Sequence, residues 1–324
     1  MVYGTSLFAK VGVLSVKPVY FIHSNHKQIV GAIVAKYSVE KTTRNADKFD
    51  VRIIELKDHK ALKSRHGKPF LREGMWPLWN NEDLQSFTPL RYLPPELMGY
   101  QGRSVVVDPD VFALSDVWDL LNRDMGGKAI LARRIYPNKN RKPYWASSVM
   151  LLDNARLKHW TWEQAIEEMF AGKRDYRDWI SLDLEPEDTL GEIEEQWNSF
   201  DKLEADTRLL HNTGRNTQPW KVGLPIDYLP KKPQPEPPAV MGLIPRKKYD
   251  AFVARIKGKP YAPQGFYVSH PDPNQERFFF ELLQECIDLG LLTDRMLRSE
   301  IKRNHVRHDL FEVLSRYNKT KKAA

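Results

Sequence analysis

Two aspartates, Asp108 and Asp110, directly follow a run of three valines, Val105–Val107. Three consecutive β-branched residues are typical of a strand that is buried on both faces. Pro109 favours an extended conformation at Asp108, and in an extended chain residues two apart project to the same side. Two carboxylates at such a short distance repel each other, and a hard divalent cation removes that repulsion. The pattern indicates a metal–diphosphate site at the carboxyl end of a strand, although Asp-Pro-Asp is also common in ordinary turns.

Around this pair the chain alternates between strand and helix patterns. Apolar or alternating runs predict strands at Pro18–His23, Phe49–Leu56, Val105–Val107, Ala129–Arg133 and Ser148–Asp153. Apolar periodicity predicts helices at Gln28–Thr42, Leu84–Leu97 and Thr161–Ala171, with loop over residues 57–80. This order implies an α/β fold whose mainly parallel sheet is covered on both faces and binds ligands at the carboxyl ends of its strands.

The last third of the chain has a different texture. Six prolines lie within Pro225–Pro238 and predict a stiff, extended connector. Beyond it, helices are expected at Tyr249–Ile256, Gln275–Leu289 and Asp294–Tyr317. We therefore predict an α/β domain over residues 1–229, and a proline-rich connector with a basic helical extension over residues 230–324.

Composition limits the class of protein. A single cysteine, Cys286, excludes an internal disulfide framework and a Cys-rich zinc site. No apolar run is long enough to span a bilayer and no signal-peptide pattern is found, so a cytoplasmic protein is expected. The net charge is +8, and nine Lys/Arg against three Asp/Glu fall within Arg295–Lys322. Such a segment can contact anionic lipid or nucleic acid, or can be a solvated helix face.

Four segments together resemble glycosyltransferase family 8, the group that contains glycogenin and bacterial lipopolysaccharide galactosyl- and glucosyltransferases. Phe87–Leu121 (FTPLRYLPPELMGYQGRSVVVDPDVFALSDVWDLL) is similar to the family's core, in which an arginine-containing helix precedes a strand that ends in Asp-x-Asp. The other segments are Val19–Val39, Ser147–Trp160 (SSVMLLDNARLKHW) and His211–Trp220 (HNTGRNTQPW). The resemblance implies a GT-A (Rossmann-like) nucleotide-sugar-binding domain over residues 1–229.

The resemblance also implies a metal centre. Asp108, Asp110 and His211 correspond to the family's ligands for a divalent cation, and this mixed oxygen and nitrogen set suits Mn²⁺, with Mg²⁺ possible. Arg91 resembles the basic residue that holds the donor diphosphate and sugar. Gly214 permits close approach of backbone to phosphate.

Other candidate residues are less closely matched. Gln218 replaces a family lysine, so Lys221 or Arg215 is expected to supply the cation. Asp178 resembles the acid that contacts the donor sugar, with Asp183 as the alternative. The nucleoside is expected to contact three residues at the end of the first strand, which are His23, Ser24 and Asn25. Two further positions depart from the family pattern, with Ala146 for its asparagine and Ser148 for its glycine.

These observations predict a metal-dependent hexosyltransferase. It would move a hexose from a nucleotide sugar, with UDP favoured, to a hydroxyl of a glycan or glycolipid, and the resemblance implies retention of configuration. One alternative is a non-catalytic nucleotide-sugar or glycan-binding protein of the same fold. A nucleic-acid-associated protein is less favoured, since the usual nucleic-acid motifs are not found. Five cations of the C-terminal helices could hold the chain against an anionic membrane, and they are Arg295, Arg298, Lys302, Arg303 and Arg307.

Overall fold

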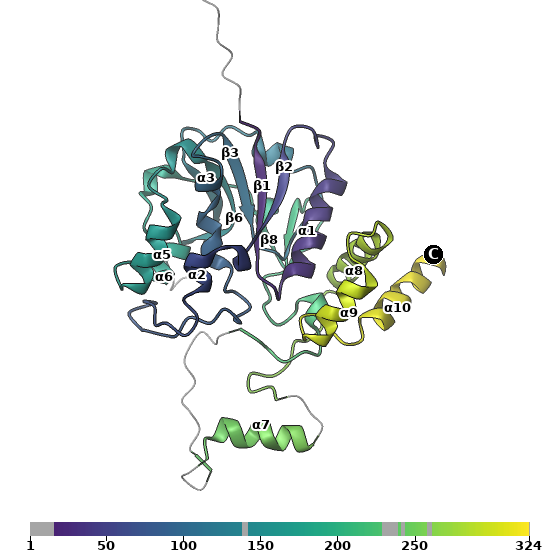
Figure 1. Ribbon diagram of the computed structural model, residues 1–324. Helices are drawn as coiled ribbons and strands as arrows, with labels where there is room; N and C mark the ends of the chain where they lie inside the picture. Colours follow the sequence, from purple (N-terminus) through teal and green to yellow (C-terminus); the bar gives the residue numbers. More distant parts are fainter. Residues whose placement is uncertain (1–15, 138–141, 229–238, 241–243, 258–260, 324) are drawn as a thin grey trace, which may run out of the picture.

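A six-stranded sheet with strand order β2-β1-β3-β6-β5-β7 lies at the centre of the molecule (Figure 1). The structure is a computed structural model and describes residues 16–137, 142–228, 239–240, 244–257 and 261–323. The strands of this sheet are β1 (Val19–Ser24), β2 (Asp50–Glu55), β3 (Arg103–Val107), β5 (Ile130–Ile135), β6 (Tyr144–Asp153) and β7 (Leu190–Glu192). Strand β1 pairs in parallel with β2 and β3, and β5 with β7, whereas β6 runs antiparallel to β3 and β5. The expected α/β class with a mainly parallel sheet is confirmed.

The valine run forms the middle of this sheet, as expected. Val105, Val106 and Val107 are fully buried, and all six residues of β1 are buried beside them. Ile22 is paired with Val107, so β1 and β3 end at the same edge of the sheet. Asp108 is the first residue after β3, so it lies at the carboxyl edge of the sheet, where α/β folds bind their ligands.

A small second sheet joins distant parts of the chain at that edge. It has the order β4-β9-β8, with β4 (Val111–Ala113), β9 (Leu209–His211) and β8 (Ser199–Phe200). Strand β4 pairs antiparallel with β9, and Val111 lies opposite His211. Since β4 begins immediately after Asp110, this pairing brings His211 next to the aspartate pair.

Helices cover both faces of the central sheet. On one face, α1 (Ile29–Thr42) and α4 (Trp118–Leu121) share an apolar core with the C-terminal helices α8 (Pro273–Asp288), α9 (Asp294–Lys302) and α10 (Leu310–Ala323). Figure 1 shows α8, α9 and α10 grouped beside α1. The second core packs α5 (Trp162–Phe170) against the other face of β1, β3 and β6. Short helices complete this side and are α2 (Lys60–Lys63), α3 (Pro94–Leu97) and α6 (Tyr176–Ile180). Helix α7 (Arg246–Ile256) precedes the C-terminal group.

Two predicted helices are not continuous. The segment 84–97 contains a 3₁₀ helix, η2 (Thr88–Tyr92), followed by α3, because Pro94 and Pro95 supply no amide hydrogen to continue the first turn. The segment 294–317 is divided into α9 and α10, with Asn304 in the left-handed region at φ 61°. Within residues 57–80, predicted as loop, the structure has the single-turn helix α2.

The C-terminal region is helical, as expected, and its helices share an apolar core with the α/β part of the chain. Phe279, Phe280 and Cys286 of α8 pack in the same cluster as Val30 and Trp220. Most of the proline-rich connector lies outside the described residues, so the boundary near residue 230 stays a prediction. Among the described residues no helix is both long and apolar enough to cross a membrane.

Candidate metal centre

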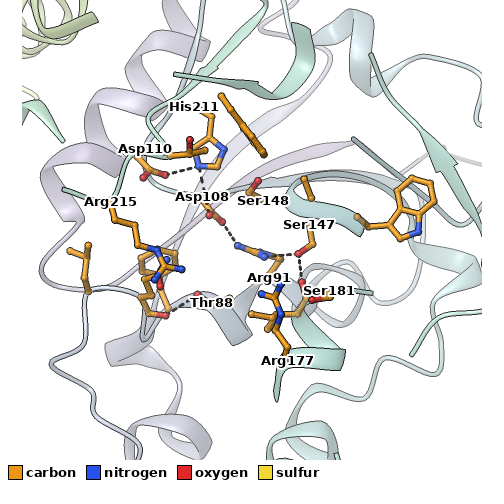
Figure 2. A pocket seen from close by; sticks show the side chains of 18 of the residues that line it. Thr88, Arg91, Asp108, Asp110, Ser147, Ser148, Arg177, Ser181, His211 and Arg215 are labelled. Atoms are coloured by element: carbon orange, nitrogen blue, oxygen red, sulfur yellow. Dashed lines mark hydrogen bonds and ion pairs between the residues drawn. The ribbon is translucent and has the colours of Figure 1, made fainter. Parts of the chain in front are cut away.

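The side chains of Asp108, Asp110 and His211 converge at the edge where β3 ends. One ligand atom from each residue lies within 4.8 Å of the others. Backbone bonds fix the loops that carry them, since the Asp108 amide donates to the Ser148 carbonyl at 3.1 Å and the Asn212 amide to the Asp110 carbonyl at 3.0 Å. The three residues predicted to share a metal therefore lie together, as Figure 2 shows.

Each carboxylate uses one oxygen inside the protein and leaves the other facing His211. Asp108 Oδ1 accepts from Arg91 Nη2 at 2.6 Å and lies 2.8 Å from His23 Nε2, whereas Oδ2 lies 4.0 Å from His211 Nε2. Asp110 Oδ2 accepts from Gln218 Nε2 at 2.9 Å, whereas Oδ1 lies 3.4 Å from His211 Nε2. Asp110 Oδ1 is buried and has no hydrogen-bond partner. A buried carboxylate oxygen without a donor is costly, and a cation would satisfy it.

The imidazole of His211 is held in the tautomer that a metal ligand needs. Its Nδ1 lies 2.9 Å from the side-chain oxygen of Asn198, which is fully buried. The carboxamide oxygen only accepts, so Nδ1 carries the hydrogen and the lone pair of Nε2 faces the carboxylates. Asn198 is fixed in turn, because its Nδ2 donates to Ser148 Oγ at 3.1 Å. Such outer hydrogen bonds orient metal-binding histidines.

The electrostatic balance of the cluster is uneven. Burial opposes ionisation of Asp108, but Arg91 and His23 outweigh it and hold the pKa of this carboxyl below its usual range. Burial lowers the pKa of His23. For His211, burial disfavours the imidazolium, yet Asp110 and Asp108 outweigh it and raise the pKa of the imidazole. Without a cation, the two carboxylates therefore attract a proton to the position where a metal would bind.

The donor set fits a hard or borderline divalent cation. Two carboxylate oxygens and one neutral imidazole nitrogen match the preferences of Mn²⁺, and Mg²⁺ accepts the same oxygens. The ion pair with Arg91 leaves this set intact, because it uses only Oδ1 of Asp108. The structure thus supports a potential site for a divalent metal ion.

The cluster forms one wall of a cavity, and Arg91 lies on that wall (Figure 2). Arg91 comes from η2, and its Nη1 donates to Ser147 Oγ at 2.6 Å. Thr213 and Arg215, from the loop after β9, also line the cavity. Gly214 lies between them and is not among the lining residues, but a Cβ at this position would collide with Thr217 Oγ1. The glycine therefore permits the tight loop that presents its neighbours.

The residues expected to contact a nucleoside are placed differently. His23, Ser24 and Asn25 are fully buried and do not line this cavity. Asn25 Nδ2 donates to the carbonyls of Asp83 and Leu84 and to Ser86 Oγ. The polar groups at the end of β1 are thus used to tie a neighbouring loop in place, which differs from the predicted direct contact.

Three further candidates lie away from this cavity. Lys221 is fully buried, lies 3.3 Å from Asp227 Oδ2, and has its pKa lowered to about 8 by burial. Asp178 lines a second cavity beside Trp160 and Trp179. Its neighbour Arg177 lines the first cavity instead, because consecutive residues of a helix point in different directions. Asp183 lines neither of these two cavities.

The sequence did not point to Asn198, which orients His211, or to Ser147 and Arg177, which line the cavity. Asn198 lies 13 positions before His211 and 50 after Ser148, so no local spacing connects them. The two departures from the family pattern, Ala146 and Ser148, both line the cavity.

No family model matches the chain, and no curated protein matches it. Among solved structures, the glycosyltransferase GlyE of Streptococcus pneumoniae TIGR4 is similar at 16% identity and a TM-score of 0.44, over 64% of this chain and 56% of GlyE. The chain thus spans little more than half the length of GlyE. A galactosyltransferase, LgtC, solved with donor and acceptor sugar analogues, is similar at 12% identity and a TM-score of 0.42, over 62% and 89%. Mouse xyloside xylosyltransferase 1 is similar at 11% identity and a TM-score of 0.39, over 60% of this chain and 96% of that protein. At TM-scores below 0.5, these likenesses assign no function to this chain.

Proposed function

We propose that this chain is a metal-dependent glycosyltransferase of the GT-A type. It would move a hexose from a nucleotide sugar, with UDP as the nucleotide, to a hydroxyl of a glycan or glycolipid. The observation that carries the proposal is the cluster of Asp108, Asp110 and His211, in which each residue turns one free lone pair to the same point on the wall of a cavity. A site of this kind suits the diphosphate of a nucleotide sugar, which is itself an oxygen ligand.

A bound Mn²⁺ or Mg²⁺ would offset the charge of the departing nucleoside diphosphate. The protein's own residues would position the donor and stabilise the charge on its diphosphate. Arg91 is fixed by Asp108 and Ser147, so its charge faces the cavity without reorganisation. We assign no nucleophile to the protein. The acceptor oxygen would bond to the anomeric carbon on the face that the diphosphate leaves, while its proton passes to a leaving phosphate oxygen, which gives retention.

For the donor diphosphate we propose Arg91 and Arg215 with the loop at Gly214. Lys221 is a weaker candidate, because it is fully buried and paired with Asp227. For the donor sugar we propose Ser147 and Arg177, since both line the cavity, whereas Asp178 lines the other one.

We also propose a peripheral position at the cytoplasmic face of a membrane. Arg295, Arg298, Lys302 and Arg303 are exposed around α9 and can contact anionic lipid. Arg307 is not available for this, because it is buried and paired with Glu276 and Asp309.

The proposal is tested by thermal unfolding with UDP, GDP and their hexose conjugates, each with and without Mn²⁺. A ligand that binds the native state raises its stability, by about 2.7 kcal/mol at a hundred times its Kd. We expect UDP ligands to raise the melting temperature only with Mn²⁺, and Asp110→Ala to abolish this shift. Asp119→Ala, which removes a carboxylate that is 63% exposed, is the matched control and should keep it.

An equal shift in the wild type and in Asp110→Ala would contradict the metal assignment. Mn²⁺-dependent binding without hydrolysis or transfer of any hexose would favour the alternative, a non-catalytic nucleotide-sugar-binding protein. Gln218 is the feature that favours this alternative, because an uncharged amide donates to Asp110 at a position where the family resemblance implies a cation.

A further inference from the structure

We infer that a ligand of this cavity carries an anionic group in addition to its diphosphate, on the donor sugar or on the acceptor. The inference rests on the proposed function and adds a substrate class to it. Its basis is an excess of arginine over carboxylate on the cavity wall.

Four arginines line the cavity, and they are Arg72, Arg91, Arg177 and Arg215. The only carboxylates among the described lining residues are Asp108 and Asp110. Arg91 is paired with Asp108. The other three arginines come from separate parts of the chain, so their convergence is a property of the fold.

These three arginines have little negative charge to balance them. Among the described residues, no carboxylate forms an ion pair with Arg177 or Arg215, although Arg177 acts to lower the pKa of the Asp183 carboxyl against the larger, raising effect of burial. Arg72 forms an ion pair with Glu73 at 3.9 Å, and because Glu73 is 49% exposed this pair is screened by solvent. Arg72 also lies over the ring of Tyr176, 5.2 Å from its centroid.

A charge balance then identifies what is missing. The two aspartates balance a divalent cation, and His211 binds it as a neutral ligand. The four arginines leave four positive charges, and the diphosphate of a nucleotide sugar neutralises two of them. Arg91 and Arg215 lie nearest the metal ligands in the chain, so we assign those two to the diphosphate. Arg177 and Arg72 remain for a further anionic group.

Arg177 is an exposed residue that lines the cavity, and its backbone is held in place. Its backbone amide donates to the Asp175 side chain at 2.7 Å, which begins helix α6. The Ser147 hydroxyl donates to the Ile180 carbonyl and so ties the end of α6 to the serine that also holds Arg91. In Figure 2 the side chain of Arg177 reaches toward the same space as Arg91. The planar guanidinium of arginine matches a carboxylate or a phosphate through two parallel hydrogen bonds.

Two sources of the anionic group can be separated by calorimetry with Mn²⁺ present. In the donor arm, the protein is titrated with UDP-glucose and UDP-glucuronate, which differ only at C6. In the acceptor arm, the protein saturated with Mn²⁺ and UDP is titrated with glucose, glucuronate and glucose 6-phosphate. Hydrogen bonds to charged groups contribute about 1.5–3 kcal/mol, which corresponds to a preference of roughly tenfold or more for the anionic ligand.

We expect this preference in at least one arm, and we expect added salt to reduce it. Arg177→Gln should lower the preference for the anionic ligand to about threefold or less. Arg177→Lys should keep part of this preference, because lysine retains the charge but lacks the two parallel donors of the guanidinium. The control is Arg156→Gln, which removes an arginine that is 56% exposed and lines none of the cavities described here, and it should keep the full preference.

Equal affinity for neutral and anionic ligands in both arms, while UDP still binds with Mn²⁺, would overturn this inference and leave the proposed function intact. A preference that survives in Arg177→Gln would also overturn it. If the wild type does not bind UDP in a Mn²⁺-dependent manner, both this inference and the proposed function are overturned.

Discussion

The metal centre can be perturbed without altering a ligand atom, through Asn198. Asn198→Ala removes the acceptor for His211 Nδ1, which lies 2.9 Å from it, and the donor to Ser148 Oγ, which lies 3.1 Å away. The imidazole can then adopt either tautomer and a range of ring orientations. Only one tautomer offers Nε2 to a cation, so the affinity for Mn²⁺ should fall.

The expected magnitude follows from these two bonds. Loss of the outer partner of a metal-binding histidine costs 10- to 100-fold in metal affinity, or about 1.4–2.7 kcal/mol. The substitution also leaves buried polar groups on His211 and Ser148 without a partner. The free energy of unfolding of the metal-free protein should therefore fall by about 1–3 kcal/mol.

Asn154→Ala is the matched control. Asn154 is also fully buried, accepts from Ser104 Oγ at 2.8 Å and donates to the Gln101 carbonyl at 3.2 Å, so its side chain bonds to residues outside the metal cluster. It should lose similar stability in urea and keep its affinity for Mn²⁺ in calorimetry. Wild-type Mn²⁺ affinity in Asn198→Ala, or an equal loss in Asn154→Ala, would refute the reasoning.

Two other predictions concern pH and lipid. Because the folded pKa of His211 is raised, its stabilising contribution to the metal-free protein is fully present below the ordinary value of about 6.5 and is lost as pH rises through the raised value, while Mn²⁺ affinity rises over the same interval. Urea unfolding and Mn²⁺ titration of wild type and His211→Gln measure this, and a difference that does not change with pH would contradict it. The cations around α9 should bind vesicles that contain acidic lipid and release them as salt is added. Sedimentation of wild type and of Arg298→Gln/Lys302→Gln measures it, and binding that salt leaves unchanged would rule the contact out.

The central strands could be predicted because their sequence pattern is local. Val105–Val107 and Val19–Ile22 are uninterrupted apolar runs, and both form buried strands that end where the site lies. The segment 84–97 could not be resolved by periodicity, because Pro89, Pro94 and Pro95 set where its turns begin. The small sheet was missed, since strands of two or three residues have no pattern to detect.

The candidate site divides in the same way. The aspartate pair follows from one strand, and family resemblance supplied His211, whose approach depends on the pairing of β4 with β9. His23 and Asn25 do lie at the end of a strand, but contacts with Asp108 and with the loop at 83–86 bury them. Asp178 and Arg177 are adjacent in sequence, yet they line different cavities, and only the course of α6 decides which one.

The most direct test of the metal centre is anomalous diffraction at the manganese edge, from crystals grown with MnCl₂ and UDP. We predict one strong peak in contact with Asp108 Oδ2, Asp110 Oδ1 and His211 Nε2, and a UDP diphosphate on the same ion. A peak held by other residues, or bound UDP with no peak at this cluster, would contradict the account.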